Sequence, residues 1–180
     1  MDFCGELWGI MCNFDAKSSL INVRMRFLGN IEGKIDAKGR AFLPVVFRKV
    51  LTASGEENLV MRKDVFRNCL TLYPESVWNA QLDTLRKRRN RWNATHQQLF
   101  RQFASDVELI TPDGNGRILI PKRFLLMARI EQAVSFIGVD DVIEIWSPEE
   151  QQQSQLSPEE FSKGLEQLMS EDPWLFTDSE

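Results

Sequence analysis

The sequence predicts an α+β fold built from two pseudo-symmetric ββαββ units. Two observations predict it: an internal repeat, and the same order of strand and helix signals in both copies. A unit of about 45 residues is small for a stable core of its own, so we expect the two units to share one. Shifting the chain by 77 positions superposes Asp36, Gly39, Arg40, Pro44 and Phe47 on Asp113, Gly116, Arg117, Pro121 and Phe124.

Each unit begins with two β-prone runs around a tight turn. In the first copy the runs are GKID (33–36) and RAFLP (40–44), joined by the turn DAKGR (36–40). The second copy has the turn DGNGR (113–117). The fourth turn residue is Gly in both, which favours a short hairpin loop with that Gly in the left-handed conformation.

A helix and two further strands complete each unit. Pro44 precedes the helical run VVFRKVL, as is typical of a helix start, and the segment SGEEN (54–58) ends it. The following strands are NLVMRK and CLTLYP in the first copy, and AVSFIGV and VIEIW in the second.

The segment between the units predicts two helices joined near residues 90–95. Its apolar side chains recur at steps of three and four residues, and Asn93 or Thr95 could begin the second helix. His96 lies on this apolar line, which favours a core or edge residue over a general base. For the run RKRRNR (86–91) we favour a solvated helix face, with nucleic-acid contact as the alternative.

The C-terminal segment is acidic and helical. The string SPEE occurs at 147 and at 157, and Ser, Pro and Glu in this order are typical of a helix start. The side chains Phe161, Leu165, Leu168 and Met169 then form one apolar edge, which we expect to pack on the core or on a neighbour. Beyond about residue 171 we expect disorder.

Charge is divided along the chain. Residues 25–146 carry 19 Lys and Arg against 14 Asp and Glu, whereas residues 147–180 carry one against nine. A basic middle beside an acidic tail suits an anionic partner for the middle. We expect a cytoplasmic protein without a membrane span, since no long apolar run or signal-peptide pattern is present, and the three cysteines suggest reduced thiols.

No enzyme motif is found. The segment GNIEGK has one residue too few between its glycines for a phosphate-binding loop, and DGNGR lacks the acidic positions of a calcium loop. With one His and no paired Cys, a zinc site is not expected either. We therefore expect no catalysis, no cofactor and no metal ion.

The paired Asp and Arg of each turn have two explanations. In one copy alone, Asp caps the turn, Gly supplies the positive φ, and Arg pairs with Asp. In two copies, pseudo-twofold symmetry could place both Arg side chains on one face. Arg reads guanine with two hydrogen bonds, and Lys or Arg neutralises phosphate. The predicted DNA-contacting residues are Arg40, Arg117, Lys38, Lys34, Arg48, Lys49, Lys122 and Arg123, with Asp36, Gly39, Asp113 and Gly116 orienting the turns.

The segments MRFLGNIEGKIDAKGRAFLPVVFR, LTLYP, DVELITPDGNGRILIP and IEIWSPE resemble the MraZ family of bacterial transcription regulators. The resemblance implies two AbrB-like units, each with a DxxxR motif, here Asp36 with Arg40 and Asp113 with Arg117. It implies a swapped-hairpin, barrel-like core and a ring-shaped homo-oligomer of more than four subunits. It also implies a nucleoid-associated repressor that binds double-stranded DNA at direct repeats upstream of the division and cell wall gene cluster.

The resemblance divides the chain into five parts. The two AbrB-like units are 25–75 and 106–147, the linking helices are 76–105, and the acidic helical tail is 148–180. Residues 1–24 have no counterpart in the family pattern. A real extension and a misplaced start codon both stay open as explanations. The competing function is a scaffolding ring that uses the same turns for contacts between subunits.

Overall fold

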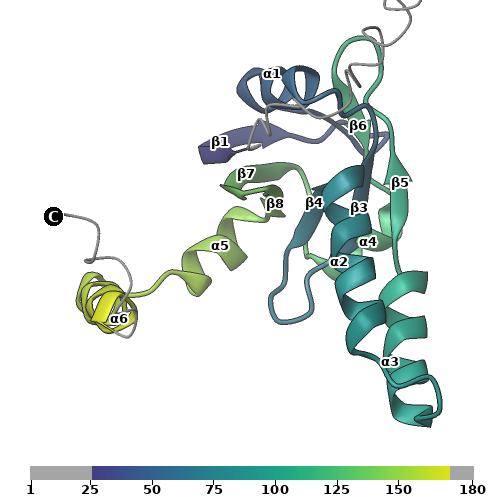
Figure 1. The fold of residues 1–180 in the computed structure, drawn as a ribbon. Coiled ribbons are helices and arrows are strands. Elements are labelled where there is room, and N and C mark those ends of the chain that lie inside the picture. Colours follow the sequence, from purple (N-terminus) through teal and green to yellow (C-terminus); the bar gives the residue numbers. More distant parts are fainter. Residues whose placement is uncertain (1–25, 171–180) are drawn as a thin grey trace, which may run out of the picture.

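The computed structural model describes residues 26–170, which form eight strands and six helices (Figure 1). The first unit contains β1 (Phe27–Lys34), β2 (Arg40–Phe42), α1 (Val45–Ala53), β3 (Leu59–Lys63) and β4 (Leu70–Pro74). The second contains β5 (Glu108–Ile110), β6 (Arg117–Leu119), α4 (Lys122–Met127), β7 (Ala133–Asp140) and β8 (Val142–Trp146). Helices α2 (Glu75–Arg88) and α3 (Ala94–Ser105) connect the units, and α5 (Pro148–Ser154) and α6 (Pro158–Ser170) follow them. The α+β class and the ββαββ order of both copies are confirmed.

The two units exchange their first strands. Strand β1 pairs antiparallel with β7, the third strand of the second unit, and β5 pairs antiparallel with β3, the third strand of the first. The equivalent strands β4 and β8 pair with each other, which gives a six-stranded sheet in the order β1-β7-β8-β4-β3-β5. Strands β2 and β6 form a separate two-stranded ladder. Neither unit therefore has a complete sheet without the other.

The hairpin that we predicted within each unit differs from the one observed. In the first unit only one bridge, Ile35 to Ala41, joins its two arms, because β2 takes β6 as its ladder partner. Strand β1 also begins at Phe27, well before the predicted run GKID, since it pairs with β7 along its whole length. Within residues 26–170 the strands form one six-stranded sheet and one two-stranded ladder, and no strand pairing joins the two into a closed barrel.

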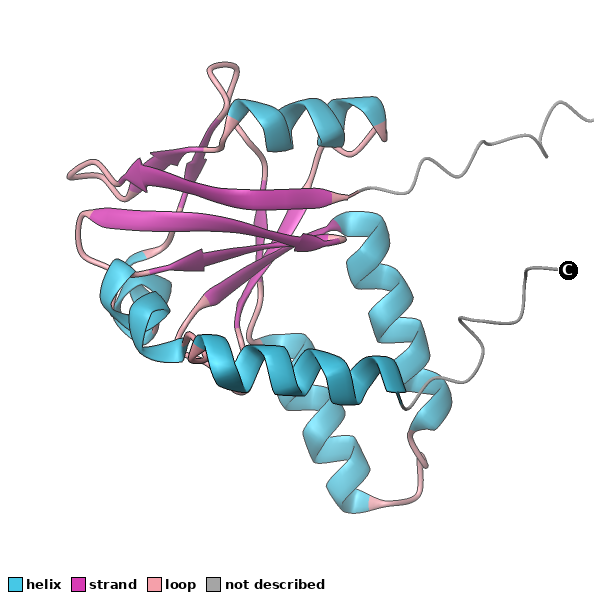
Figure 2. Ribbon diagram, turned by 90° about the vertical axis from the view of Figure 1, so that its left-hand side faces the viewer, coloured by secondary structure: helices cyan, strands magenta, loops and turns pink. Residues whose placement is uncertain are grey.

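One core serves both units, as expected. The equivalent residues Phe47 of α1 and Phe124 of α4 are both fully buried in it, and the ring of Phe27 packs edge-on against Phe47 at 5.7 Å. Ala41 of β2 and Ile118 of β6 lie in the same cluster. The β2–β6 ladder is thus fixed to the core by its inner face, with helices on the outside of the sheets (Figure 2).

The predicted starts of three helices are confirmed by the side chains that cap them. The carboxamide oxygen of Asn93 accepts a hydrogen bond from the backbone N–H of His96, which caps α3. Ser147 caps α5 in the same way through Glu150. At α6, Ser157 and Glu160 bond reciprocally, which is a capping box.

The apolar line of the linking helices is only partly buried. Trp78 of α2 is buried and its ring stacks on Phe103 of α3 at 5.2 Å. Trp92 and Leu99, however, are 96% and 60% exposed. They lie near the outer end of the α2–α3 hairpin, which projects beyond the sheets, away from the other described elements (Figure 1).

Helix α6 does not pack on the core of its own chain. Every residue of α6 is exposed, and the helix lies apart from the sheets, beyond α5 (Figure 1). Of the two packing partners that we expected for its apolar edge, only a neighbour stays open. The predicted extension 1–24 and the end of the chain beyond residue 171 lie outside the described residues.

Candidate functional site

The first DxxxR turn is closed by Asp36. Its Oδ1 accepts hydrogen bonds from the backbone N–H groups of Lys38 and Arg40, both at 2.9 Å. Its Oδ2 accepts from the Arg40 guanidinium, at 2.8 Å from Nε and 2.7 Å from Nη2. One carboxylate therefore shapes the backbone and also sets the direction of the Arg side chain.

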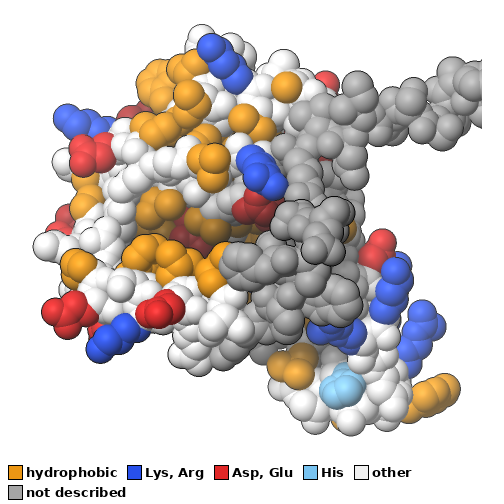
Figure 3. All heavy atoms as spheres, turned by 60° about the vertical axis from the view of Figure 1, so that its left-hand side comes forward, with side chains coloured by type: hydrophobic (Ala, Val, Ile, Leu, Met, Phe, Trp, Pro, Cys, Tyr) orange, Lys and Arg blue, Asp and Glu red, His pale blue; other side chains and the backbone are white. Residues whose placement is uncertain are grey.

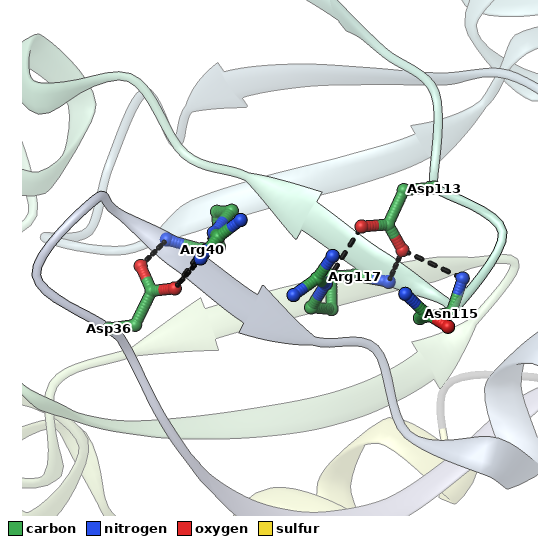
Figure 4. Close-up of polar contacts among 5 residues, drawn as sticks. All are labelled: Asp36, Arg40, Asp113, Asn115 and Arg117. Atoms are coloured by element: carbon green, nitrogen blue, oxygen red, sulfur yellow. Dashed lines mark hydrogen bonds and ion pairs between the residues drawn. The ribbon is translucent and has the colours of Figure 1, made fainter.

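The second turn repeats this arrangement. Oδ1 of Asp113 accepts from the backbone N–H groups of Asn115 and Arg117, both at 2.9 Å. Oδ2 of Asp113 accepts from Nε of Arg117 at 2.7 Å. Figure 4 shows the two pairs on either side of the crossing strands β2 and β6.

Gly is required in both turns. Gly39 and Gly116 have φ values of 82° and 77°, which side chains rarely adopt. A Cβ on Gly39 would lie 2.9 Å from the carbonyl oxygen of Ile120, and one on Gly116 would overlap the side chain of Arg48. The carbonyl groups of both glycines extend the ladder, since they accept from the N–H groups of Ile120 and Leu43 at 2.8 and 3.0 Å.

Both Arg side chains lie on one face of the β2–β6 ladder. Arg40 stands opposite Leu119, and Phe42 stands opposite Arg117. Residues directly opposite in an antiparallel pair share a face, and so do residues two apart in one strand. The outer face therefore carries Arg40, Phe42, Arg117 and Leu119, while the residues between them are buried.

The carboxylates are kept ionised by the donors around them. Hydrogen bonds from the backbone N–H and then from the guanidinium of Arg40 lower the pKa of Asp36 to about 2, from an ordinary value of 3.8. The backbone N–H of Arg117 similarly lowers the pKa of Asp113. Both turns thus stay charged and closed at neutral pH.

Each guanidinium keeps donors for a ligand. Nη1 of Arg40 has no acceptor among residues 26–170, and the same holds for both terminal nitrogens of Arg117. The Arg117 guanidinium lies 6.0 Å from the centre of the Phe42 ring. The side chains of Arg40 and Arg117 are 34% and 28% exposed. They are accessible, yet their orientation is set by Asp.

The other predicted contact residues fall into two groups. The ammonium groups of Lys34, Lys38, Lys49 and Lys122 are exposed and have no protein acceptor within the described part of the chain. Arg48 and Arg123 are instead engaged with the protein. Nε of Arg48 donates to the carbonyl of Leu43 at 3.1 Å, and Arg123 pairs with Glu108 at 2.8 Å.

Each turn borders a hollow that the other unit helps to form. A hollow of about 400 Å³ beside the first turn is lined by Asp36 and Gly39 and, from the second unit, by Lys122 and Glu131. The hollow beside the second turn measures about 430 Å³, and the first unit adds Arg48, Glu56 and Glu57 to its lining. The lining of the first hollow is therefore less acidic than that of the second.

Sequence reasoning missed two residues of this face. Phe42 and Leu119 are 62% and 54% exposed although both are large and apolar. The signal was present, because Phe42 lies two residues after Arg40 in a predicted strand and must share its face. The partner Leu119 could not be assigned, since the pairing of β2 with β6 was not foreseen.

The described residues offer no other site of familiar chemistry. Within residues 26–170 there is no group of three His, Cys, Asp or Glu side chains placed to hold a metal ion. None of the described helices is long and apolar enough to cross a membrane. His96 is exposed, and its Nδ1 accepts a hydrogen bond from the backbone N–H of Asn90.

Comparison with known proteins matches both units. Residues 26–102 and 103–172 each match the family described as MraZ protein. The chain is 60% identical to the transcriptional regulator MraZ of Bacteroides thetaiotaomicron over 148 residues, which cover 82% of this chain and 95% of the relative. It is 61% identical to the protein of that name from Phocaeicola vulgatus over 145 residues, or 81% and 94% of the two chains. For the one from Christiangramia forsetii the identity is 32% over 149 residues, or 82% and 96%.

Proposed function

The chain belongs to the MraZ family, and from this premise we propose that it is a transcriptional regulator that binds duplex DNA with the outer face of the β2–β6 ladder. One observation carries the proposal. Arg40 and Arg117 stand on the same face of one ladder, and each is held by an Asp four residues earlier. Relatives that carry the name transcriptional regulator support it.

The ladder suits the major groove, which admits a two-stranded β-ribbon. Arg40 and Arg117 are diagonal neighbours in the ladder, and such neighbours are roughly 7–8 Å apart. Successive bases rise by about 3.4 Å, so the two side chains reach base pairs about two steps apart. Each presents terminal N–H donors to O6 and N7 of guanine, and the apolar Phe42 and Leu119 suit thymine methyl groups.

The Asp partners prepare the Arg side chains for contact. A long side chain that is already ordered loses less entropy when it binds. The bond between Nε and Asp restricts the guanidinium of Arg40 and of Arg117, while Nη1 of Arg40 and both terminal nitrogens of Arg117 have no acceptor among residues 26–170. Asp36 and Asp113 thus act as positioning residues, and Gly39 and Gly116 permit the turns that hold them.

Phosphate contact falls to the exposed cations around the ladder. Lys38 lies within the first turn, Lys122 lines the hollow beside it, and Lys34 and Lys49 are exposed before and after it in the sequence. Contacts of this kind position a protein on DNA without reading its sequence. Arg48 and Arg123 could join them only by giving up their contacts within the protein.

The wider biological role follows the family resemblance. We propose a cytoplasmic, nucleoid-associated repressor of the division and cell wall gene cluster that binds upstream direct repeats as a ring of more than four subunits. One ladder covers only a few base pairs, and linked copies raise the overall affinity through effective concentration. A cyclic assembly repeats its contact head to tail, which fits direct repeats. The exchange of β1 and β5 supports a swapped-hairpin, barrel-like core.

Fluorescence anisotropy with duplex DNA from upstream of the chain's own gene tests the proposal. We expect at least tenfold tighter binding to the intact repeats than to a scrambled duplex, and a further tenfold loss when one repeat of three is removed. Arg40→Ala should abolish the preference, since one bidentate base contact is worth about 1–3 kcal/mol. Arg26→Ala, which removes an exposed Arg that also pairs with an Asp, should retain it. Equal affinity of the unmodified chain for the intact repeats and for the scrambled duplex would refute the proposal.

A scaffolding ring is the second candidate, favoured by one observation. The exposed Phe42 and Leu119 would also suit a contact between subunits. In that case Arg40→Ala would dissociate the assembly, which sedimentation velocity detects, and no duplex would be preferred at any salt concentration. Phosphate contacts instead make the logarithm of affinity fall with the logarithm of salt, by about 0.9 per contact.

A further inference from the structure

We propose that the outer end of the α2–α3 hairpin is the docking site for helix α6 of a second copy of the chain. The hairpin end has an apolar hollow of about 180 Å³, lined by Leu85, Arg88, Arg89, His96, Leu99 and Phe100. Leu99 is 60% exposed at this hollow, and Trp92 nearby is 96% exposed. Apolar side chains left open to this degree mark an interaction surface.

The rim of this hollow is basic and lacks acidic partners. The run 86–91 holds five Lys and Arg, and among the described residues only Arg86 of this run pairs with an acid, Asp83, at 3.2 Å. The guanidinium of Arg89 lies over the ring of Phe100 at 4.2 Å, and its buried Nε has no acceptor within residues 26–170. Figure 3 shows Lys and Arg side chains (blue) gathered around the His at this projecting end, with hydrophobic groups beside them. A partner should therefore be apolar on one side and acidic beside it.

Helix α6 has these properties and needs a partner. Its apolar edge, Phe161, Leu165, Leu168 and Met169, is 44–66% exposed. A 13-residue helix is marginal in water by itself, and Gly164 in its middle weakens it further. The capping box at Ser157 fixes its start, so a contact along the apolar edge is what the helix still lacks.

The two surfaces are complementary in charge and length. Glu159 and Glu166 are seven residues, or two turns, apart and share one side of α6, and Glu166 is three residues from Met169 of the apolar edge. Arg88 lines the hollow, and the exposed Lys87 and Arg91 are its near neighbours in the sequence. At 1.5 Å per residue α6 is about 20 Å long, and the 12-residue α3 is about 18 Å. When the apolar edge of α6 docks on the hollow, Glu159 and Glu166 would face the basic rim along one side of the helix.

A second copy fits better than the same chain. In the described structure α6 lies well apart from its own α2–α3 hairpin, on the far side of α5 from the sheets (Figure 1). A contact of α6 with a neighbour's hairpin joins two different surfaces, and such head-to-tail contacts generate rings when they close. The inference thus rests on the self-association included in the proposed function, and it names surfaces that bring the copies together.

Hydrogen exchange of the full chain tests the docking. We expect the backbone amides of 158–170 to exchange at least tenfold more slowly than in an unfolded peptide. The double variant Arg88→Glu, Arg91→Glu should remove this protection, although it alters no residue of α6. Adding Glu159→Lys and Glu166→Lys to the same chain restores opposite charges and should restore the protection, which also shows that the hairpin variant folds.

Cross-linking separates a second copy from the same chain. A carbodiimide joins amines to carboxylates, and Lys87 is the one Lys of the run 86–91. In an equal mixture of ¹⁴N- and ¹⁵N-labelled chains we expect links from Lys87 to Glu159 or Glu166, about half of them between a light and a heavy chain. Links confined to one isotope would overturn the proposal.

Two other outcomes also overturn it. One is an unprotected α6 in the unmodified chain. The other is an α6 that keeps its protection in the hairpin variant while DNA binding weakens, since the hairpin would then be a nucleic-acid surface. DNA binding is measured separately, so a chain that binds the intact repeats without docking α6 refutes this inference alone. A chain that docks α6 without binding DNA refutes the proposed DNA function alone.

Discussion

Gly39→Ala tests how tightly the first turn is held against the second unit. The substitution places a Cβ 2.9 Å from the carbonyl oxygen of Ile120, at a backbone φ of 82°. A left-handed φ costs an L-residue about 1–2 kcal/mol. Overpacking against a fixed neighbour adds about 1–3 kcal/mol, and the backbone of Ile120 is held in place because its N–H donates to the carbonyl of Gly39.

Gly55→Ala is the matched control, because Gly55 has a φ of 71° but nothing within 4 Å of its Cβ position. The two variants share the backbone strain, so their difference isolates the contact with Ile120. For a chain of this size 1 kcal/mol shifts the melting temperature by about 2–4 °C. We therefore expect Gly39→Ala to melt about 2–12 °C below Gly55→Ala, in circular dichroism at equal protein concentrations. Equal melting temperatures would refute the tight approach of the turn to β6.

Three further substitutions test the turn, the core and the linking helices. Asp36→Asn should lower the melting temperature at pH 7 but not at pH 2. The pKa of Asp36 is about 2 in the folded chain and about 3.9 in the unfolded chain. The ionised carboxylate therefore stabilises the fold above pH 4, and this stabilisation is lost as the pH falls towards 2. A constant difference from pH 7 to pH 2 would contradict this. Phe124→Ala, at a fully buried position, should lower the free energy of unfolding by about 3–5 kcal/mol in urea, and a loss below 1 kcal/mol would place the ring outside the shared core. Asn93→Ala should cost about 1 kcal/mol in the same titration through the lost cap of α3, whereas Asn93→Asp, which can still accept the bond, should cost much less.

The helices and strands could be predicted well from the two repeat copies because their starts and ends are set by local sequence signals. Turn glycines, Pro before a helix and Ser caps act within a few residues, so Gly39, Pro44 and Ser147 could be interpreted from the sequence. The pairing partner of each strand could not be predicted from such local signals. Alternation shows which side chains share a face, but not which strand lies beside them, and the exchange of β1 and β5 follows from completing a sheet between two units.

The residues of the candidate site were also predicted only as far as local sequence signals allow. The DxxxR pairs were found because Asp and Arg are four residues apart, within one turn. Arg48 was predicted to contact DNA, yet its side chain packs against Gly116 of the second unit. Its equivalent after the 77-residue shift is Leu125, which packs against Gly39, so an apolar residue at this place in the second copy indicates a packing position. Arg123 pairs with Glu108, 15 residues away, and no local pattern indicates such a pair.

Arg40→Lys tests most directly whether the Asp-held guanidinium groups on the β2–β6 ladder read DNA. Lys keeps the charge but cannot reproduce the planar donor pair or the bond from Nε to Asp36. In anisotropy titrations on intact and scrambled repeats at several salt concentrations, we predict that the preference falls at least tenfold while the salt dependence stays within one phosphate contact of the original. An unchanged preference, or an equal loss on both duplexes with a reduced salt dependence, would show that Arg40 acts only as a charge and would contradict the account.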